Sequence, residues 1–578
     1  MDLERLIAVA RGDAPGDLLL RNARIVNVFT SEIEEGDVVI AEGRVAGVGP
    51  GYAAAEVIDL RSSYLLPSFI DGHIHPESSH LYVHEYARAV VPRGVTSIVT
   101  DLHELANVGG LPALRRYLQD AEGLPLDVFL MVPSCVPATT HLETSGATLD
   151  ADAVAEALTW PSALGLGELM DFPGVIAGHG RCLDKVRAAA PLTDLRPSGR
   201  VIDGHAPHLT GRALNAYLAA GPRSDHESTA LEEGREKLRR GMHLMIREGT
   251  TEKNLAELLP LVTDDTYARC LLVVDDRSPA DLRDEGDLDA VVRKAVRLGL
   301  DPIRAVQLAT INPATYFGLR DRGAVAPGHL ADLIVADNLT DIRARLVLYR
   351  GRPVAEDGRA LFPVPSTALA QLTSGFQVRP LPEDAFALTA PAGSVPVIEI
   401  VPGQIITRRV DIHPRVEDGR IIADPERDVV KLAVVERHHG TGNLGVGLVR
   451  GLGLRRGAIA SSFAHDSHNI VVAGVSDPDM LAAVRHLADA GGGLTAVLDG
   501  RPLATFPLPV AGLMSPEPLA TAAEQYRAVE DAAAGLGASV HAPFAVLSFL
   551  ALPVIPEIKV TDRGLVDVNA SAFIDLSA

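Results

Sequence analysis

The sequence predicts an α/β protein built around a parallel barrel of eight strand–helix repeats, with a small β domain and a C-terminal α/β domain attached. Three observations predict this architecture. Strand-like apolar runs alternate with helical stretches through the middle of the chain, and polar residues recur where those runs end. Two β-rich segments flank the repeats.

Composition narrows the class of protein. The chain has 578 residues, of which 47% are hydrophobic, so it can fill several cores and is not disordered or fibrous. A net charge of −22 and only 4% aromatic residues argue against a nucleic-acid partner or binding to an anionic membrane. No signal peptide and no long uncharged apolar run is found. Three widely spaced cysteines fit a reducing compartment, so we expect a soluble cytoplasmic protein.

The first element is a β domain in two pieces. Residues 18–66 read as short strands separated by Gly, Pro or charged turn residues, and a similar block returns at 323–362. We expect residues 1–66 and 323–365 to form one small β-sandwich domain. The alternative is two unrelated β segments.

The barrel comes next, at residues 67–322. Eight apolar runs end there, separated by helical spacers such as LPALRRYLQDAEG and LDAVVRKAVRLG. The sixth run is weak by pattern. The runs are SFIDGHIH (68–75), GVTSIVTD (94–101), DVFLMVPSC (127–135), ALGLGELM (163–170), RVIDGHAP (200–207), RSDHE (223–227), MHLMIREG (242–249) and RCLLVVDD (269–276).

A C-terminal α/β domain is expected at 366–578, after a connecting stretch at 366–395 that is rich in Pro, Ala and Ser. Its predicted strands include VPVIEIVPG and VVKLAVVER. The glycine-rich sequence GTGNLGVG superficially suggests phosphate binding, but it lacks the strand–GxxxxGK–helix context. Turn glycines are the better interpretation.

Polar residues at the strand ends predict a metal site, because the carboxyl ends of parallel barrel strands meet on one face. In the H-x-H motif, alternation along a strand turns both imidazoles to the same side. For Glu168 the alternative to a bridging ligand is a solvated surface glutamate. For His226, in SDHE, the alternative to a metal ligand is a residue of an ordinary polar loop. The predicted ligands are His73, His75, Glu168, His205, His226 and Asp275.

This set holds four imidazoles and two carboxylates and no thiolate. It suits two divalent metal ions, Mn(II) or Fe(II) first and Zn(II) second. Two such ions generate a hydroxide at neutral pH and polarise the group that it attacks, so the predicted chemistry is hydrolysis. Of the two acids at the eighth strand end, Asp275 directly follows the strand and is better aimed than Asp276.

The motifs also carry a family resemblance that spans most of the chain. The chain resembles the amidohydrolase superfamily and, within it, the adenine deaminase family. The segments that carry this are PSFIDGHIHPESSH, GVTSIVTDLHELANV, SCVPATTHLETSGA, GLGELMDFPGV, DGHAPHLTG, SDHES, MIREGTTEKNL, VDDRSPADL, ATINPATYFGL, APGHLADL and HGTGNLG…GAIASSFAHDSHNI.

The resemblance implies hydrolysis of adenine to hypoxanthine and ammonia, in purine salvage, with Glu168 bridging the metals in place of a carboxylated lysine. Asp275 would move the proton of the attacking hydroxide to the departing amine. Glu77 would protonate a ring nitrogen, or else serve as a loop hydrogen-bond acceptor. We expect a homo-oligomer, a dimer or larger.

Seven further residues are weaker candidates for substrate contact. They are Asp101, His103, Glu104, Asp276, His465, Asp466 and His468, the last three as part of a C-terminal segment that reaches over the barrel mouth. For Asp101, His103 and Glu104 the alternatives are binding of an extra metal ion or membership of a structural polar cluster.

The sequence departs from the family pattern at Ser68, Pro76, Leu102 and Val274, of which Pro76 and Val274 border the expected pocket. None of the four is a ligand, but substrate preference or rate can differ. Two other functions stay open: an amidohydrolase that acts on another amino-heterocycle or a cyclic amide, and a non-catalytic metal-binding scaffold.

Overall fold

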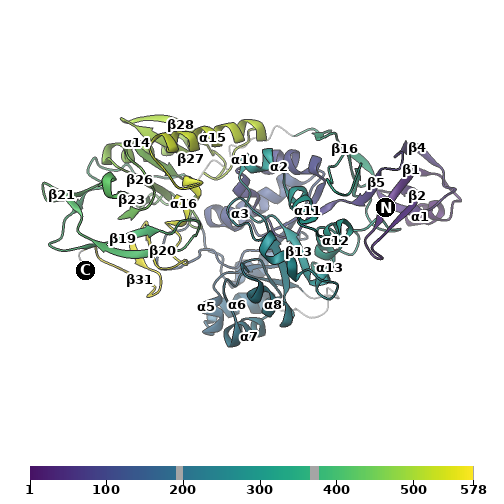
Figure 1. Ribbon diagram of the computed structural model, residues 1–578, viewed down its shortest axis with the longest axis horizontal. Coiled ribbons are helices and arrows are strands. Elements are labelled where there is room, and N and C mark those ends of the chain that lie inside the picture. The colour runs from purple at the N-terminus through teal and green to yellow at the C-terminus, as the bar shows by residue number, and fades with distance from the viewer. Residues whose placement is uncertain (190–199, 365–375, 577–578) are drawn as a thin grey trace.

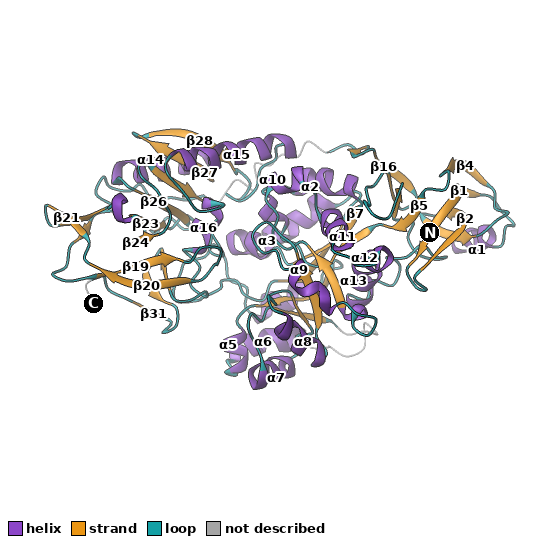
Figure 2. Cartoon of the chain, viewed as in Figure 1, coloured by secondary structure: helices purple, strands orange, loops and turns teal. Residues whose placement is uncertain are grey.

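The computed structural model describes residues 1–189, 200–364 and 376–576. Figure 1 shows the N-terminal strands at one end of the long axis, a central region of strands and helices, and the C-terminal region at the other end. Helices surround the central strands (Figure 2). Part of the predicted connecting stretch, 366–375, lies outside the described residues, as does the predicted boundary at 365.

Eight parallel strands occupy the central region, one for each predicted run, so all eight strand predictions are confirmed. Five pair in the order β10-β9-β8-β7-β6 and three in the order β11-β12-β13. Only two residues make up the sixth strand, which explains its weak pattern. The strands are β6 (Phe69–Asp71), β7 (Val95–Thr100), β8 (Asp127–Val132), β9 (Ala163–Leu169), β10 (Val201–Gly204), β11 (Ser224–Asp225), β12 (His243–Arg247) and β13 (Cys270–Val273).

Backbone hydrogen bonds join these two parallel sheets at both margins. At one margin Arg223 N donates to Ile202 O at 3.0 Å. At the other, His75 N donates to Asp275 O and Asp275 N donates to His73 O, both at 3.0 Å. The carboxyl ends of strands from both sheets therefore face one shared edge.

Side chains from strands of both sheets meet in one buried cluster between them, which includes Ile70, Val99, Met131, Leu164, Met245, Leu271 and Val273. The surrounding helices bury apolar residues against these strands. In α11 (Leu288–Arg297), for example, Leu288, Val291, Val292 and Ala295 are buried at helical spacing. The other helices of this region are α2 (Val83–Val90), α3 (His103–Ala121), α4 (Ala151–Leu158), α5 (Phe172–Ile176), α6 (Gly180–Ala189), α7 (Gly211–Ala220), α8 (Leu231–Arg239), α9 (Leu255–Leu258), α10 (Pro279–Asp284), α12 (Pro302–Leu308) and α13 (Ile311–Tyr316).

The two β-rich segments that flank the central region share one nine-stranded sheet. Its order is β17-β16-β15-β14-β5-β1-β2-β3, with β4 paired to β1. The segments join where β5 and β14 pair antiparallel, with Leu66 opposite Ile334. The helix α1 (Leu3–Ala10) contacts β2 and β3. The strands are β1 (Gly16–Asn27), β2 (Glu32–Ala41), β3 (Arg44–Val48), β4 (Ala54–Asp59), β5 (Tyr64–Pro67), β14 (Leu333–Ala336), β15 (Leu346–Tyr349), β16 (Arg352–Glu356) and β17 (Arg359–Ala360).

The C-terminal region contains an eight-stranded mixed sheet in the order β20-β19-β24-β23-β26-β25-β27-β28. Helix α14 (Asp477–Ala490) contacts the four strands β26, β25, β27 and β28 at one end of this sheet, and α15 (Leu519–Gly535) contacts β27 and β28 as well as α10. The strands are β19 (Val395–Ile400), β20 (Thr407–Ile412), β23 (Val429–Val435), β24 (Leu444–Arg450), β25 (Ala458–Ser461), β26 (Ile470–Gly474), β27 (Gly493–Leu498) and β28 (Arg501–Pro507). The two strands predicted here correspond to β19 and β23. Two smaller sheets contain β18 (Leu388–Thr389), β21 (Arg415–Glu417) and β22 (Arg420–Ile422), and β29 (Ile558–Thr561), β30 (Gly564–Asp567) and β31 (Ala572–Phe573).

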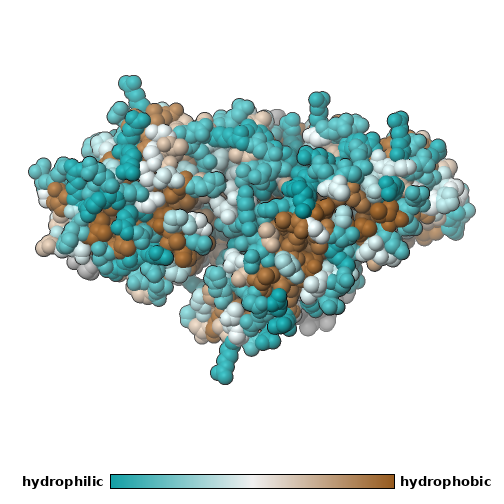
Figure 3. All heavy atoms as spheres, in the orientation of Figure 1, coloured by the Kyte–Doolittle hydropathy of each residue, from teal (hydrophilic) through white to brown (hydrophobic). Residues whose placement is uncertain are grey.

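Hydrophilic side chains spread over every part of the face drawn in Figure 3, in keeping with the high net charge. None of the helices that the structure describes combines the length and the apolar character needed to span a bilayer.

Candidate metal centre

The six predicted ligands all lie at the carboxyl ends of the eight parallel strands. They follow β6, β10, β11 and β13, or sit within the last residues of β9. Five are buried and one, His205, is partly exposed. The structure therefore brings together the whole set that the strand-end pattern predicts.

Glu168 lies between two groups of histidines. Its Oε2 is 2.7 Å from His205 Nδ1 and 3.2 Å from His226 Nε2. Its Oε1 is 3.4 Å from His75 Nε2 on the other side. Burial alone would raise the pKa of this carboxyl, but His205 and His226 hold it well below its usual range. One carboxylate is thus shared by both groups, as a bridging ligand requires.

Asp275 completes the group around the H-x-H motif. Its Oδ1 is 3.4 Å from His73 Nε2 and 3.3 Å from His75 Nε2. His73, His75 and Asp275 form one buried group of possible metal ligands, and His73, Glu168 and His226 form another. Among the described residues, His73 Nε2 is buried without a hydrogen-bond partner. Imidazole and carboxylate atoms that converge without proton donors fit divalent metal ions.

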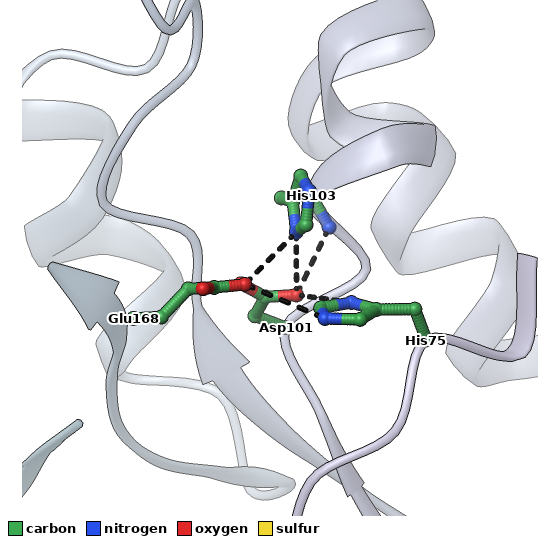
Figure 4. Close-up of side chains that lie close together, drawn as sticks. All are labelled: His75, Asp101, His103 and Glu168. Carbon is green, nitrogen blue, oxygen red and sulfur yellow. Dashed lines mark hydrogen bonds and ion pairs between the residues drawn. The ribbon is translucent and has the colours of Figure 1, made fainter. Parts of the chain in front are cut away.

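Asp101 and His103 lie beside His75 and Glu168 (Figure 4). Asp101 follows β7, and its Oδ1 is 3.3 Å from His75 Nδ1 and 3.0 Å from His103 Nδ1. The second contact is a hydrogen bond, and His103 Nδ1 is also 3.5 Å from Glu168 Oε1. The Asp101 carboxylate beside Nδ1 of His75 orients this imidazole so that its Nε2 faces Glu168 and Asp275, as is common for metal-bound histidines.

Sequence reasoning missed two residues of the site, Arg247 and Glu227. Arg247 ends β12, and its Nη1 donates to Asp275 Oδ2 at 2.6 Å. The same guanidinium donates twice to Glu227, at 2.5 and 2.9 Å. Burial would raise the pKa of Asp275, but Arg247 and the neighbouring histidines hold it well below its usual range. The signal was present, because Arg247 is a charged residue at the end of the apolar run MHLMI.

Two further acids keep a free oxygen near the centre. Glu77 is fully buried, and its Oε1 accepts from Leu105 N at 3.2 Å while its Oε2 has no partner among the described residues. Burial raises the pKa of Glu77 to about 7. Burial and the neighbouring Asp275 likewise raise the pKa of Asp276 to about 7. Both groups therefore exchange protons near neutral pH.

The C-terminal segment reaches the carboxyl ends of the parallel strands. His465 Nδ1 and His468 Nε2 both contact the carboxylate of Glu104, at the start of α3. The His465 ring also stacks on Phe549, with centroids 4.7 Å apart. A cavity of about 60 Å³ between the two regions is lined by His465, Phe549 and Asp276, among other residues. This region thus forms one wall of the space beside the metal centre.

The departures from the family pattern leave the ligands in place. Pro76 starts a short 3-10 turn, Pro76–Ser79, that carries Glu77 into the interior. Leu102 adopts a left-handed backbone conformation, with φ 52°, between Asp101 and His103. Val274 is fully buried and Ser68 Oγ lies 2.6 Å from Thr96 Oγ1.

Comparison with known proteins gives matches to two family models. The model "Amidohydrolase family" matches residues 64–379, and "Adenine deaminase C-terminal domain" matches residues 404–572. An adenine deaminase of Dehalococcoides mccartyi (strain CBDB1) is 52% identical over 573 residues, which cover 99% of each chain. The chain belongs to the adenine deaminase family. Adenine deaminase 2 of Carboxydothermus hydrogenoformans is 46% identical over 579 residues, covering 100% of this chain and 99% of that protein.

Solved structures similar to this adenine deaminase family member include a β-aspartyl dipeptidase of Fervidobacterium islandicum AW-1 in complex with β-Asp-Leu dipeptide. It has TM-score 0.45 and 18% identity, and covers 60% of this chain and 98% of that chain. The L-hydantoinase of Arthrobacter aurescens has TM-score 0.41 and 17% identity, and covers 60% of this chain and 98% of that chain. The resemblance that the motifs predict is confirmed by the family matches, and the chain has the amidohydrolase fold with flanking β-sheets.

Proposed function

We propose that the protein hydrolyses adenine to hypoxanthine and ammonia, in purine salvage. The observation that carries this is the combination of full-length identity to adenine deaminases with an intact acid–imidazole set at the strand ends. In the reaction a C6–O bond forms from water, the C6–N bond breaks, and the amine leaves with the proton that it needs to become ammonia.

Two divalent metal ions are part of this proposal, Mn(II) or Fe(II) first and Zn(II) second. His73, His75 and Asp275 would hold one ion, His205 and His226 would hold the other, and Glu168, which lies between the two groups, would serve both. When bound, such ions lower the pKa of water and polarise the group under attack.

Asp275 is the proposed proton carrier. Arg247 occupies its Oδ2, so Oδ1, which faces His73 and His75, takes the proton of the attacking water and passes it to the departing amine. Glu77 is the proposed acid toward a ring nitrogen, because its Oε2 is unpaired and its pKa of about 7 lets it hold a proton at neutral pH. Asp276, Asp101, His103, Glu104, His465, Asp466 and His468 remain proposed substrate contacts.

The finer architecture is also a proposal. The hydrogen bonds at both sheet margins support a closed (β/α)8 barrel at residues 67–322. One apolar cluster with side chains from both β1–β3 and β14–β15 supports a sandwich built from residues 1–66 and 323–365. Residues 366–578 are then the C-terminal domain. We also propose a homo-oligomer, a dimer or larger, in the cytoplasm; light scattering after size exclusion tests its size.

Ammonia release from adenine by the Mn(II)-loaded protein tests the function. A parallel panel of other purines, pterins and hydantoins covers the alternative amidohydrolase function. Turnover of a hydantoin without turnover of adenine would overturn the proposal in favour of that alternative. Two bound metals with no turnover on any compound would instead indicate a scaffold.

A further inference from the structure

His103 presents its two ring nitrogens to two different groups of acids. Its Nδ1 faces Asp101 and Glu168, as described above. Its Nε2 faces away from the metal centre, 3.5 Å from Glu104 Oε1. Nδ1 forms the hydrogen bond with Asp101, whereas Nε2 makes the longer contact with Glu104, so Nε2 is directed at this second group of acids.

The C-terminal region adds a third possible ligand, Asp466, beside His103 and Glu104. Asp466, together with His103 and Glu104, offers ligand atoms that all lie within 4.8 Å of one another. The three residues are 3%, 5% and 1% exposed. Asp466 Oδ2 is buried and has no hydrogen-bond partner in the described structure. A buried acid oxygen that accepts no hydrogen bond, next to a second acid, calls for a cation.

We propose that His103, Glu104 and Asp466 form a third divalent metal site, which ties the barrel mouth to the C-terminal region. One imidazole and two carboxylates without thiolate suit Mn(II), Fe(II) or Zn(II). The site goes beyond the two catalytic ions, because none of its three ligands belongs to the set assigned to them. In this arrangement His103, Glu104 and Asp466 hold a metal ion in place of the substrate contact proposed for them above.

His465 and His468 support this assignment as outer contacts of the site. His465 Nδ1 contacts Glu104 Oε1 and His468 Nε2 contacts Glu104 Oε2, so the two imidazoles together fix the plane of the carboxylate. A carboxylate oxygen has two lone-pair directions, so Oε1 can accept from His465 and still bind a cation on the His103 side. The competing arrangement is metal-free: a protonated His103 pairs with Glu104, and Asp466 Oδ2 stays unpaired.

Metal counting separates these two arrangements. The full-length protein is loaded with Mn(II), freed of excess metal by gel filtration, and analysed by mass spectrometry. We expect three equivalents per chain in the wild type and two in Asp466→Asn, with unchanged circular dichroism. Two equivalents in both proteins would support the metal-free arrangement and overturn the proposal.

Asp562→Asn is the matched control. Asp562 is also a buried acid of the C-terminal region at the same boundary, where it accepts from Thr144 N at 2.8 Å and from Asn443 Nδ2 at 3.1 Å. It belongs to no group of possible ligands among the described residues. This variant should keep three equivalents, so loss of metal from both variants would point to a disturbed boundary and contradict a site at Asp466.

Anomalous diffraction at the manganese edge locates the ion in crystals soaked with Mn(II). We expect an anomalous peak bounded by His103 Nε2, Glu104 and Asp466. Because Mn(II) stays in the soaking solution, this measurement also detects an ion that gel filtration would remove, and the absence of a peak overturns the site. Glu168→Gln should lose the two catalytic ions and retain this peak. Failure to release ammonia from adenine would reject the proposed function and leave these measurements unaffected.

Discussion

At the scale of single residues, Asp275 divides its two carboxylate oxygens between different tasks. Oδ1 faces His73 and His75, while Oδ2 receives a hydrogen bond from Arg247. A buried guanidinium stabilises the anion and fixes its plane, so the orientation of Asp275 depends on a residue from the neighbouring strand. Arg247 therefore belongs to the site although it faces no other predicted ligand directly.

Asp275→Asn should abolish detectable adenine turnover, whereas Asp276→Asn should lose far less activity. General acid–base help contributes about 10²–10⁴ in rate, and Asp275 is also a proposed ligand. Steady-state kinetics of both variants, with metal content measured alongside, decide the ranking. The reverse ranking would assign the proton to Asp276, whose Oδ1 has no partner among the described residues and whose pKa is about 7.

Arg247→Gln should lower kcat by roughly 10–100-fold, because it leaves Asp275 and Glu227 without the group that orients them. Arg293→Gln is the control: Arg293 is 4% exposed against 6% for Arg247, and it pairs with Asp289 on α11, away from the centre. Both variants should lose stability, but only the first should lose kcat. Equal kcat in the two variants would leave Arg247 with a structural role only.

Glu143→Gln should stabilise the fold, and more so as the pH rises. Burial raises the pKa of Glu143 to about 8, and its Oε2 has no partner among the described residues. The folded carboxyl therefore keeps its proton up to a higher pH than the unfolded one, which costs stability progressively from about pH 4.5 to about pH 8. Urea unfolding at pH 5 and pH 8 should show a larger difference between the proteins at pH 8. A constant difference would contradict the raised pKa.

At the scale of elements, β9 brings Glu168 to the centre through two glycines. A Cβ on Gly165 would lie 1.9 Å from Val201 O on the paired strand β10. A Cβ on Gly167 would lie 2.8 Å from the Cβ of Asp101. The close packing of β9 with its neighbours therefore depends on the missing side chains.

Gly165→Ala should destabilise the protein by on the order of 1–3 kcal/mol, because the new methyl group pushes β9 and β10 apart. Gly180→Ala is the matched control, since Gly180 starts α6 and a Cβ there meets no atom of the described chain within 4 Å. Denaturant unfolding should show the loss only in the first variant. Similar denaturation midpoints for the two variants would mean that β9 and β10 move apart at little cost in free energy and would contradict the prediction.

Much of this was predictable from sequence at the level of elements. Each strand end pairs an apolar run with a polar residue, which located all eight strands and the six predicted ligands. Arg247 was missed because a charged residue at the end of a strand is equally typical of a strand end exposed to solvent. Glu227 was missed because it follows His226 in a polar stretch, where a glutamate has no distinguishing pattern. The contact of His468 with Glu104 joins residues 364 positions apart, and no local pattern reports such a distance.

At the scale of the whole molecule, the C-terminal region contacts the central region at Glu104. All three cysteines are free and buried. Cys182 donates to Asp171, and Cys135 and Cys182 line one cavity of about 270 Å³, whose lining contains none of the predicted ligands. None of the groups of possible metal ligands among the described residues contains a cysteine.

The triple variant Cys135→Ser, Cys182→Ser, Cys270→Ser should therefore keep its metal and its rate. Some loss of stability is expected, because serine places a more polar group in buried positions. Metal analysis, adenine kinetics and circular dichroism together test this. Collapse of the metal content in a folded protein would show that the ligand assignment is wrong.

The antiparallel pairing of β5 with β14 has a consequence for how the chain is made. Leu66 cannot find Ile334 until the ribosome has added the whole stretch between them. At about 5–20 residues per second, that wait lasts on the order of ten seconds to a minute. The contact between Glu104 and His468 forms later still after synthesis of its first residue, because these residues are 364 positions apart. The edge of β5 in the nascent chain therefore stays unpaired while the central region is being synthesised. An unpaired strand edge promotes aggregation, so the chain most needs protection from aggregation during this interval.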